Sequence, residues 1–126
     1  MIQEKTAVKT TVEKGYQAEL YAKKYLIKQG LIWCTSNYRS RAGEIDLVMQ
    51  GPCGVLVFVE VRQRVSSAFG GAAASVTRRK QDKLMKTASY YLMTHPNQGN
   101  QGVRFDVLAL DGNPPRVTWI KQAFEE

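Results

Sequence analysis

Residue types that build covalent cross-links and soft-metal sites are scarce in this sequence. It has two cysteines, Cys34 and Cys53, and one histidine among 126 residues. The cysteines lie far apart with no Cys-x-x-Cys pair, so neither a zinc site nor a disulfide framework is predicted, and reduced thiols in the cytoplasm fit best. No long apolar run occurs, and residues 1–12 alternate polar residues with lysines, which predicts no signal peptide and no membrane span.

Acidic residues are outnumbered by basic ones. Eleven Asp and Glu against eighteen Lys and Arg leave a formal charge of +7. Such a surplus favours an acidic polymer or an anionic membrane surface as partner, and clustering of the charges favours nucleic acid. The alternative is a basic protein whose charge only keeps it in solution. The length fits one domain, with a flexible tail over residues 1–12 and a single domain over residues 13–126.

The order of the predicted helices and strands indicates an α/β fold. Apolar periodicity with a glycine stop at Gly30 predicts a helix over residues 13–29. Thr77 is the predicted N-cap of a second helix that runs to Thr94. Strands are predicted over residues 31–38, 44–49 and 55–62 before this helix, and over residues 103–110 and 117–123 after it. The order helix, three strands, helix, two strands implies a mixed β-sheet flanked by helices.

Two acidic residues are predicted to meet on neighbouring strands. In the strand over residues 44–49, Asp46 alternates with Ile45 and Leu47, and in the strand over residues 55–62, Glu60 shares a face with Phe58. If the hairpin between them turns about Cys53, positions pair when their numbers sum to 106. Asp46 then lies directly across from Glu60, with Cβ atoms about 4.5 to 5.5 Å apart.

A divalent cation would resolve the conflict between these like charges. Facing carboxylates destabilise a sheet and raise a pKa unless a cation lies between them. Oxygen-only ligands suit Mg²⁺ or Mn²⁺. The alternatives are that Asp46 caps a backbone group at a strand end and that Glu60 is a solvated, outward residue. The apolar run over residues 55–61, interrupted by one acid, favours a strand covered on both faces, where a charge needs a reason.

The residues around this acidic pair resemble the PD-(D/E)XK nuclease superfamily. Residues 43–47 read Gly-Glu-Ile-Asp-Leu, and residues 57–62 read Val-Phe-Val-Glu-Val-Arg. The resemblance is greatest to the YraN-like bacterial family, which is similar to archaeal Holliday-junction resolvases. It spans roughly residues 15–110 and includes Glu19 with Ala22 and Leu26, Asn37-Tyr38-Arg39 with Arg41, and Arg104-Phe105-Asp106-Val107.

The resemblance implies a restriction-endonuclease-like fold and a metal-dependent endonuclease acting on DNA, including branched or structured DNA. It implies that Asp46 and Glu60 are metal ligands and that Glu19 is a further acid of the site. Glu19 shares a helical strip with Ala22 and Leu26 and would point towards the sheet. The alternative for Glu19 is an i,i+4 ion pair with Lys23. Because resolvases of similar fold use two active sites, the analogy implies a homodimer.

Arg62 stands where the superfamily motif has a lysine. Arginine stays protonated and cannot act as a general base, but it can clamp the scissile phosphate or stabilise charge that develops on it. The predicted register also pairs Arg62 with Glu44, so a cross-strand salt bridge is an alternative. A non-catalytic nucleic-acid-binding module on the same scaffold therefore stays open beside the endonuclease.

Positive charge clusters on the second helix and at strand ends. Arg79, Lys83 and Lys86 are spaced i, i+4 and i+7, opposite the apolar residues Leu84, Ala88 and Tyr91. Further arginines lie at the predicted strand ends near the acidic pair: Arg39, Arg41, Arg62 and Arg64. Together they predict a surface that follows phosphates without reading base sequence. Taken alone, the helical stripe could equally be a solvated face.

Overall fold

The computed structural model describes residues 11–64 and 76–125. Residues 1–10, 65–75 and 126, together with the side chains of residues 11–14 and 64, lie outside this description. The elements are α1 (Thr11–Lys28), β1 (Ile32–Arg39), β2 (Glu44–Gln50), the 3-10 turn η2 (Pro52–Gly54), β3 (Leu56–Arg64), α2 (Arg78–Thr94), β4 (Val103–Asp111) and β5 (Arg116–Ile120). The predicted order is confirmed, and α1 begins at Thr11, inside the segment predicted as tail.

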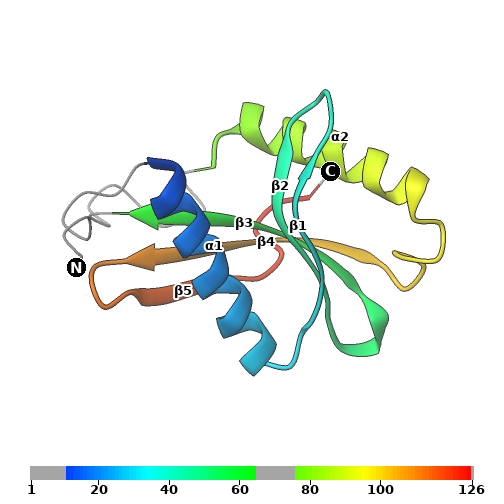
Figure 1. Ribbon diagram of the computed structural model, residues 1–126. Coiled ribbons are helices and arrows are strands. Elements are labelled where there is room, and N and C mark those ends of the chain that lie inside the picture. Colours follow the sequence, from blue (N-terminus) through cyan, green and yellow to red (C-terminus); the bar gives the residue numbers. More distant parts are fainter. Residues whose placement is uncertain (1–10, 65–75, 126) are drawn as a thin grey trace, which may run out of the picture.

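The strands form one mixed five-stranded sheet in the order β1-β2-β3-β4-β5 (Figure 1). Neighbours pair antiparallel except β3 and β4, which are parallel. A parallel pair requires a crossover connection, and α2 lies in the segment that joins β3 to β4. The α/β class and the mixed sheet of a restriction-endonuclease-like scaffold are therefore confirmed.

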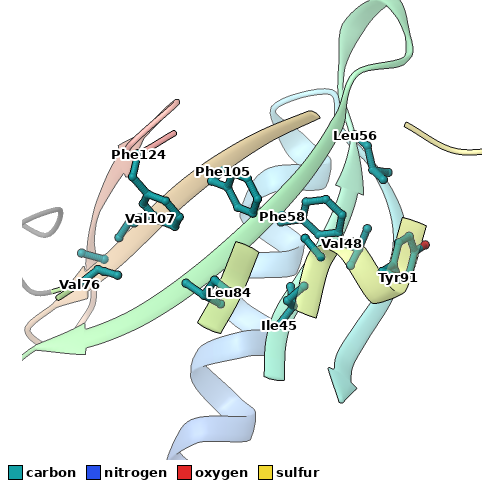
Figure 2. Close-up of a cluster of buried hydrophobic side chains, with 12 residues drawn as sticks. Ile45, Val48, Leu56, Phe58, Val76, Leu84, Tyr91, Phe105, Val107 and Phe124 are labelled. Atoms are coloured by element: carbon teal, nitrogen blue, oxygen red, sulfur yellow. The ribbon is translucent and has the colours of Figure 1, made fainter. Parts of the chain in front are cut away.

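The two helices cover opposite faces of the sheet (Figure 1). Ala22 and Leu26 of α1 pack in one apolar cluster with Val57 and Val59 of β3. The other face carries a cluster of side chains from α2 and from β2, β3 and β4, which Figure 2 shows at close range. Strand β3 is thus buried on both sides, which explains its nearly continuous apolar sequence. None of the helices described is long and apolar enough to cross a bilayer.

The hairpin between β2 and β3 has the predicted register. Pairs run from Gln50↔Leu56 to Leu47↔Val59, and each pair sums to 106. The turn places Cys53 at a φ of 61°, in the left-handed region that tight turns require. The ladder ends at Leu47↔Val59, one step before Asp46 and Glu60. The two acids therefore lie where β2 begins to leave β3.

Candidate active site

The side-chain alternation of β1 and β2 breaks at one facing pair, Asn37 and Asp46. The pairs Ser36↔Leu47 and Tyr38↔Ile45 flank this position. Leu47 belongs to the cluster under α1, whereas Ile45 belongs to the cluster under α2. The prediction that these two residues share a face is therefore wrong. Asn37 has a φ of 54°, so β1 also departs from regular strand geometry at this position.

Asp46 bridges the opening between β2 and β3. Its Oδ2 accepts a hydrogen bond from the backbone N–H of Val61 at 2.8 Å. The alternative that Asp46 caps a backbone group is thus confirmed, but the bond occupies only one of the two carboxylate oxygens. Asp46 therefore does not form a regular cross-strand pair with Glu60. Its side chain instead links β2 to β3 just beyond the last backbone pair of the ladder.

Glu60 lies next to Asp46 on the face covered by α2. The residue is only 5% exposed, so the alternative of a solvated, outward position is wrong. Its Oε2 lies 3.2 Å from Nε of Arg62 and 3.8 Å from Nζ of Lys80. Its Oε1 is buried and has no hydrogen-bond partner among the described residues. A buried carboxylate oxygen without a donor is costly, and such atoms often mark a ligand site.

Glu19 approaches Asp46 from α1, as its helical strip predicts. Burial and the charge of Asp46 together raise the pKa of Glu19 to about 7, although a hydrogen bond with Asn37 opposes the rise. The alternative ion pair with Lys23 is not formed, because Nζ of Lys23 lies 3.6 Å from the centre of the Trp33 ring. Acids from three elements, α1, β2 and β3, thus influence one another.

Negative charge in this cluster exceeds what the neighbouring cations neutralise. Burial and the adjacent Asp46 charge together raise the pKa of Glu60 to about 7, against the opposing effects of Lys80 and Arg62. Burial likewise raises the pKa of Asp46, although the Val61 N–H lowers it. Protons are bound where carboxylates crowd together, and a metal ion can replace them.

The donor set fits a metal that needs few protein ligands. Within residues 11–64 and 76–125, no three Asp, Glu, His or Cys side chains converge closely enough to form a complete ligand set. Mg²⁺ typically takes one or two carboxylates and completes its shell with water and phosphate oxygens. The two carboxylates of Asp46 and Glu60 are the donors that such a site needs, and Oε1 of Glu60 has no hydrogen-bond partner among the described residues. Glu19 reaches Asp46 from α1 and forms a hydrogen bond with its side chain.

Arg62 points to the acids and not to Glu44. Its Nε lies 3.2 Å from Oε2 of Glu60, but no hydrogen bond is formed there. Oε2 of Glu44 instead lies 3.5 Å from Nε of Arg39. The predicted cross-strand bridge between Arg62 and Glu44 is therefore wrong, because the ladder between β2 and β3 ends before it reaches them.

The predicted basic stripe is exposed on α2. Arg79, Lys83 and Lys86 face outward, whereas Leu84, Ala88 and Tyr91 are buried. The loop between β1 and β2 packs against this helix, since Oγ of Ser40 lies 3.4 Å from Oγ1 of Thr87. That loop carries Arg41, which is exposed. The Arg64 side chain lies outside the described residues.

Lys80 is the residue of the site that the sequence pattern did not single out. It lies one position after Arg79, which turns it away from the basic stripe and onto the strip of Leu84, Thr87 and Tyr91. A lysine at the head of an otherwise buried strip was the available signal. Its side chain is 40% exposed and extends to the Glu60 carboxylate.

A second buried carboxylate, Asp106, shows what a structural acid looks like in the same protein. It is 0% exposed. Its two oxygens accept bonds from Nε and a terminal nitrogen of Arg104 at 2.8 and 2.9 Å, Nε1 of Trp119 at 2.9 Å and the Gln122 N–H at 3.0 Å. Asp106 has a full set of donors, whereas Glu60 lacks one. This difference separates a residue that ties strands together from one that is suited to a ligand.

A mixed sheet between two helices, with crowded carboxylates where β2 and β3 separate, defines an α/β protein with a restriction-endonuclease-like scaffold. The family model described as Uncharacterised protein family UPF0102 matches residues 18–110. The chain belongs to this family, the YraN-like family of the PD-(D/E)XK-like nuclease superfamily.

Similar bacterial proteins cover most of the chain. A UPF0102 protein of Legionella pneumophila is 44% identical over 115 residues, which are 91% of this chain and 97% of the relative. One of Cupriavidus necator is 48% identical over 121 residues, covering 96% and 89%. One of Saccharophagus degradans is 48% identical over 112 residues, covering 89% and 92%. These relatives confirm the family that the two sequence runs indicated.

Proposed function

We propose that this protein is a divalent-metal-dependent endonuclease that hydrolyses phosphodiester bonds in DNA, with branched or structured DNA as the preferred substrate. The observation that carries the proposal is the buried Glu60, whose Oε1 has no hydrogen-bond partner among the described residues and which lies beside Asp46. An unpartnered buried oxygen and crowded negative charges both destabilise a fold, so their presence supports a role in ligand binding.

Asp46 and Glu60 would hold Mg²⁺ or Mn²⁺, and Glu19 would support them from α1. The ion would lower the pKa of a water molecule and offset negative charge on the phosphate. Asp46 keeps its place through the Val61 N–H, so the site and the strand opening are fixed together. Arg62, half-buried and close to Glu60, would contact the scissile phosphate.

The DNA would lie across the exposed residues of α2 and the adjacent loop. Arg79, Lys83 and Lys86 would contact phosphates, joined by Arg39, Arg41 and Arg64. Such contacts do not read base sequence, which agrees with recognition of DNA shape.

We further propose that two copies act together, because one compact site cannot cut both strands of a junction at once. The cytoplasm, where Mg²⁺ and DNA are both present, is the proposed compartment.

A second function has one observation in its favour. Arg62 replaces the motif lysine and lies 3.2 Å from Glu60, where its permanent charge partly neutralises the acid. A chain that had lost cleavage could retain the scaffold and bind nucleic acid without cutting. The two functions differ in whether a divalent ion causes strand scission.

Cleavage assays on DNA of different shapes test the proposal. Wild-type protein is incubated with a four-way junction, single-stranded DNA and duplex DNA, each with Mg²⁺, Mn²⁺ or EDTA. We expect metal-dependent cleavage, strongest on the junction, and its loss in Asp46→Asn. Asp82→Asn is the matched control, because Asp82 is an exposed acid of α2 that pairs with Arg78, and its substitution changes the charge equally.

The outcomes separate the two functions. Salt-sensitive binding without any cutting by the wild type would support the binding module, especially if Arg62→Lys restored cleavage. Equal cleavage by the wild type and Asp46→Asn would point to a contaminating nuclease and overturn the proposed site. Loss of cleavage in Asp82→Asn as well would show that the effect follows total charge and not the acidic pair.

A further inference from the structure

We propose that Lys80 of α2 supplies the lysine that residue 62 lacks, and that its ammonium group contacts the scissile phosphate or the attacking water. This assignment rests on the proposed function and deepens it. Lys80 would be a catalytic residue that comes from a helix and not from the strand that carries Glu60.

The position of Lys80 is the first support. Nζ of Lys80 lies 3.8 Å from Oε2 of Glu60, the same oxygen that Nε of Arg62 approaches from β3. Lys80 also lowers the pKa of Asp46, so its charge acts on both proposed metal ligands. The ammonium group is therefore close to the two carboxylates that would hold the ion, where it could contact a substrate phosphate.

The backbone of α2 fixes this position. Oγ1 of Thr77 caps the helix by accepting the N–H of Lys80 at 3.1 Å. Four residues later Leu84 is buried in the apolar cluster that also contains Ile45 and Val107 (Figure 2). The helix cap and the buried Leu84, one turn later, together fix the position of the Lys80 Cα over the sheet. The four methylene groups of the side chain still allow the ammonium group to move.

The contact with Glu60 leaves hydrogen-bond donors of Lys80 free. A separation of 3.8 Å is an ion pair but too long for a hydrogen bond. Glu60 is the only ion-pair partner of Lys80 in the part of the chain that the structure describes. An ammonium group has three donors, and the side chain is 40% exposed, so a substrate oxygen can reach it. The Arg62 side chain is somewhat more buried, with 31% of its surface exposed.

In the proposed hydrolysis, Lys80 acts as a positively charged hydrogen-bond donor and stays protonated throughout. In hydrolysis, a water oxygen bonds to phosphorus, one P–O ester bond breaks, one water proton goes to the departing sugar oxygen and the other to solvent. Negative charge grows on the non-bridging oxygens as this happens. The Lys80 ammonium would donate to one of these oxygens or to the water and would hold it in line.

Substitution of Lys80 tests the assignment, with Lys24→Ala as the matched control because Lys24 is an exposed lysine of α1. Single-turnover cleavage in Mg²⁺ is measured together with DNA affinity in EDTA, Mn²⁺ affinity by calorimetry and the melting temperature. For Lys80→Ala we expect cleavage to fall about 100-fold. DNA affinity should change less than about threefold, and Mn²⁺ should bind at least as tightly because a nearby positive charge is gone.

A relocation variant makes the test sharper. Lys80→Ala combined with Arg62→Lys returns a lysine to the strand position. We expect this double variant to cleave about tenfold faster than Lys80→Ala alone. Lys80→Arg should recover less, because the planar guanidinium group fits a different geometry.

Three results would overturn the assignment. Wild-type cleavage rates in Lys80→Ala would do so while leaving the metal site intact, provided Asp46→Asn is inactive. An equal loss of DNA affinity and cleavage would make Lys80 a plain phosphate contact. A large fall in melting temperature with weakened Mn²⁺ binding would make it a structural partner of Glu60. If the wild type cuts no substrate while Asp46→Asn binds DNA normally, the proposed function itself fails.

Discussion

Asp46 reaches across the gap between β2 and β3 to accept the backbone N–H of Val61 at 2.8 Å. The bond forms one step beyond the last paired residues, Leu47 and Val59. It satisfies an amide that the separating strands would otherwise leave without a partner. The same carboxylate therefore joins β2 to β3 and is a ligand of the proposed metal site. One side chain would thus contribute to both stability and function.

Substitutions of Asp46 should separate these two roles. Asn retains an oxygen that can accept the Val61 N–H, so Asp46→Asn should keep its stability but lose Mn²⁺ binding and cleavage. Asp46→Ala removes the acceptor as well and should lower the free energy of unfolding by about 1 to 3 kcal/mol. Urea unfolding and calorimetry with Mn²⁺ measure the two effects. Equal stability of the two variants would contradict the structural role of the hydrogen bond.

The stability of the metal-free protein should decrease as the pH rises. The pKa of Glu60 is raised from its ordinary value of 4.5 to about 7, so the folded chain holds a proton that the unfolded chain releases. This contribution is complete below pH 4.5 and is lost as the pH passes about 7. Urea unfolding in EDTA at pH 5 and pH 8 should show it, and Glu60→Gln should flatten the difference.

A divalent ion should reverse that trend for the wild type. Binding to the folded state alone stabilises it, and the carboxylates bind better once they are deprotonated. We expect Mn²⁺ to raise the melting temperature at pH 8, with little effect at pH 5 and little effect in Glu60→Gln. An equal rise in the variant would place the ion elsewhere.

The α2 stripe should set the salt dependence of DNA binding. Replacement of Arg79, Lys83 and Lys86 by glutamine removes three exposed charges that the structure places on one side of the helix. The slope of log K against log salt should become smaller by about three, with similar losses for different DNA sequences. Fluorescence anisotropy across a salt series measures this. An unchanged slope would mean that the stripe is only a solvated face.

Asn37 should tolerate glycine better than alanine. Its φ of 54° is unfavourable for most side chains and costs about 1 to 2 kcal/mol, but glycine adopts it freely. Asn37→Ala should therefore destabilise the fold by about 1 kcal/mol more than Asn37→Gly. Both variants remove the hydrogen bond to Glu19, so the pKa of that residue should rise in both. Urea unfolding and NMR titration of the glutamate would show the two effects separately.

Asp106 offers a contrast to Glu60. Asp106→Asn breaks a buried pair with Arg104 and should cost about 3 kcal/mol or more, without changing Mn²⁺ affinity. Glu60→Gln should have the opposite profile at pH 8, with preserved or increased stability and lost metal binding. Unfolding and calorimetry of both variants under the same conditions would decide. Similar profiles for the two would remove the distinction between a structural and a ligand-binding acid.

Local patterns predicted the sheet and the acidic pair well. Turn residues around Cys53 and strict alternation on both sides leave one register for the hairpin, and the observed pairs sum to 106 as expected. The Thr77 cap was also predictable, because a threonine hydroxyl directly before a helix can accept a backbone N–H of the first turn. These features depend on residues that are close together in the sequence.

Contacts between distant elements were not predictable in the same way. The alternation rule assumes a regular strand, and it failed at Ile45, one residue before the point where β2 faces the left-handed Asn37 of β1. Lys80 was missed because helical spacing describes one helix at a time. It cannot show that the first turn of α2 lies over Glu60, which depends on how the crossover from β3 returns to the sheet.

The two thiols of the chain differ enough to be told apart chemically. Cys53 is exposed at the β2–β3 turn, whereas Cys34 is half-buried and burial raises its pKa. Thiol reagents attack the thiolate form, so a maleimide dye should react first at the turn. A fluorophore can thus be attached at a single defined point of the natural sequence. Energy transfer between donor- and acceptor-labelled copies would then test whether two copies come together on a DNA junction.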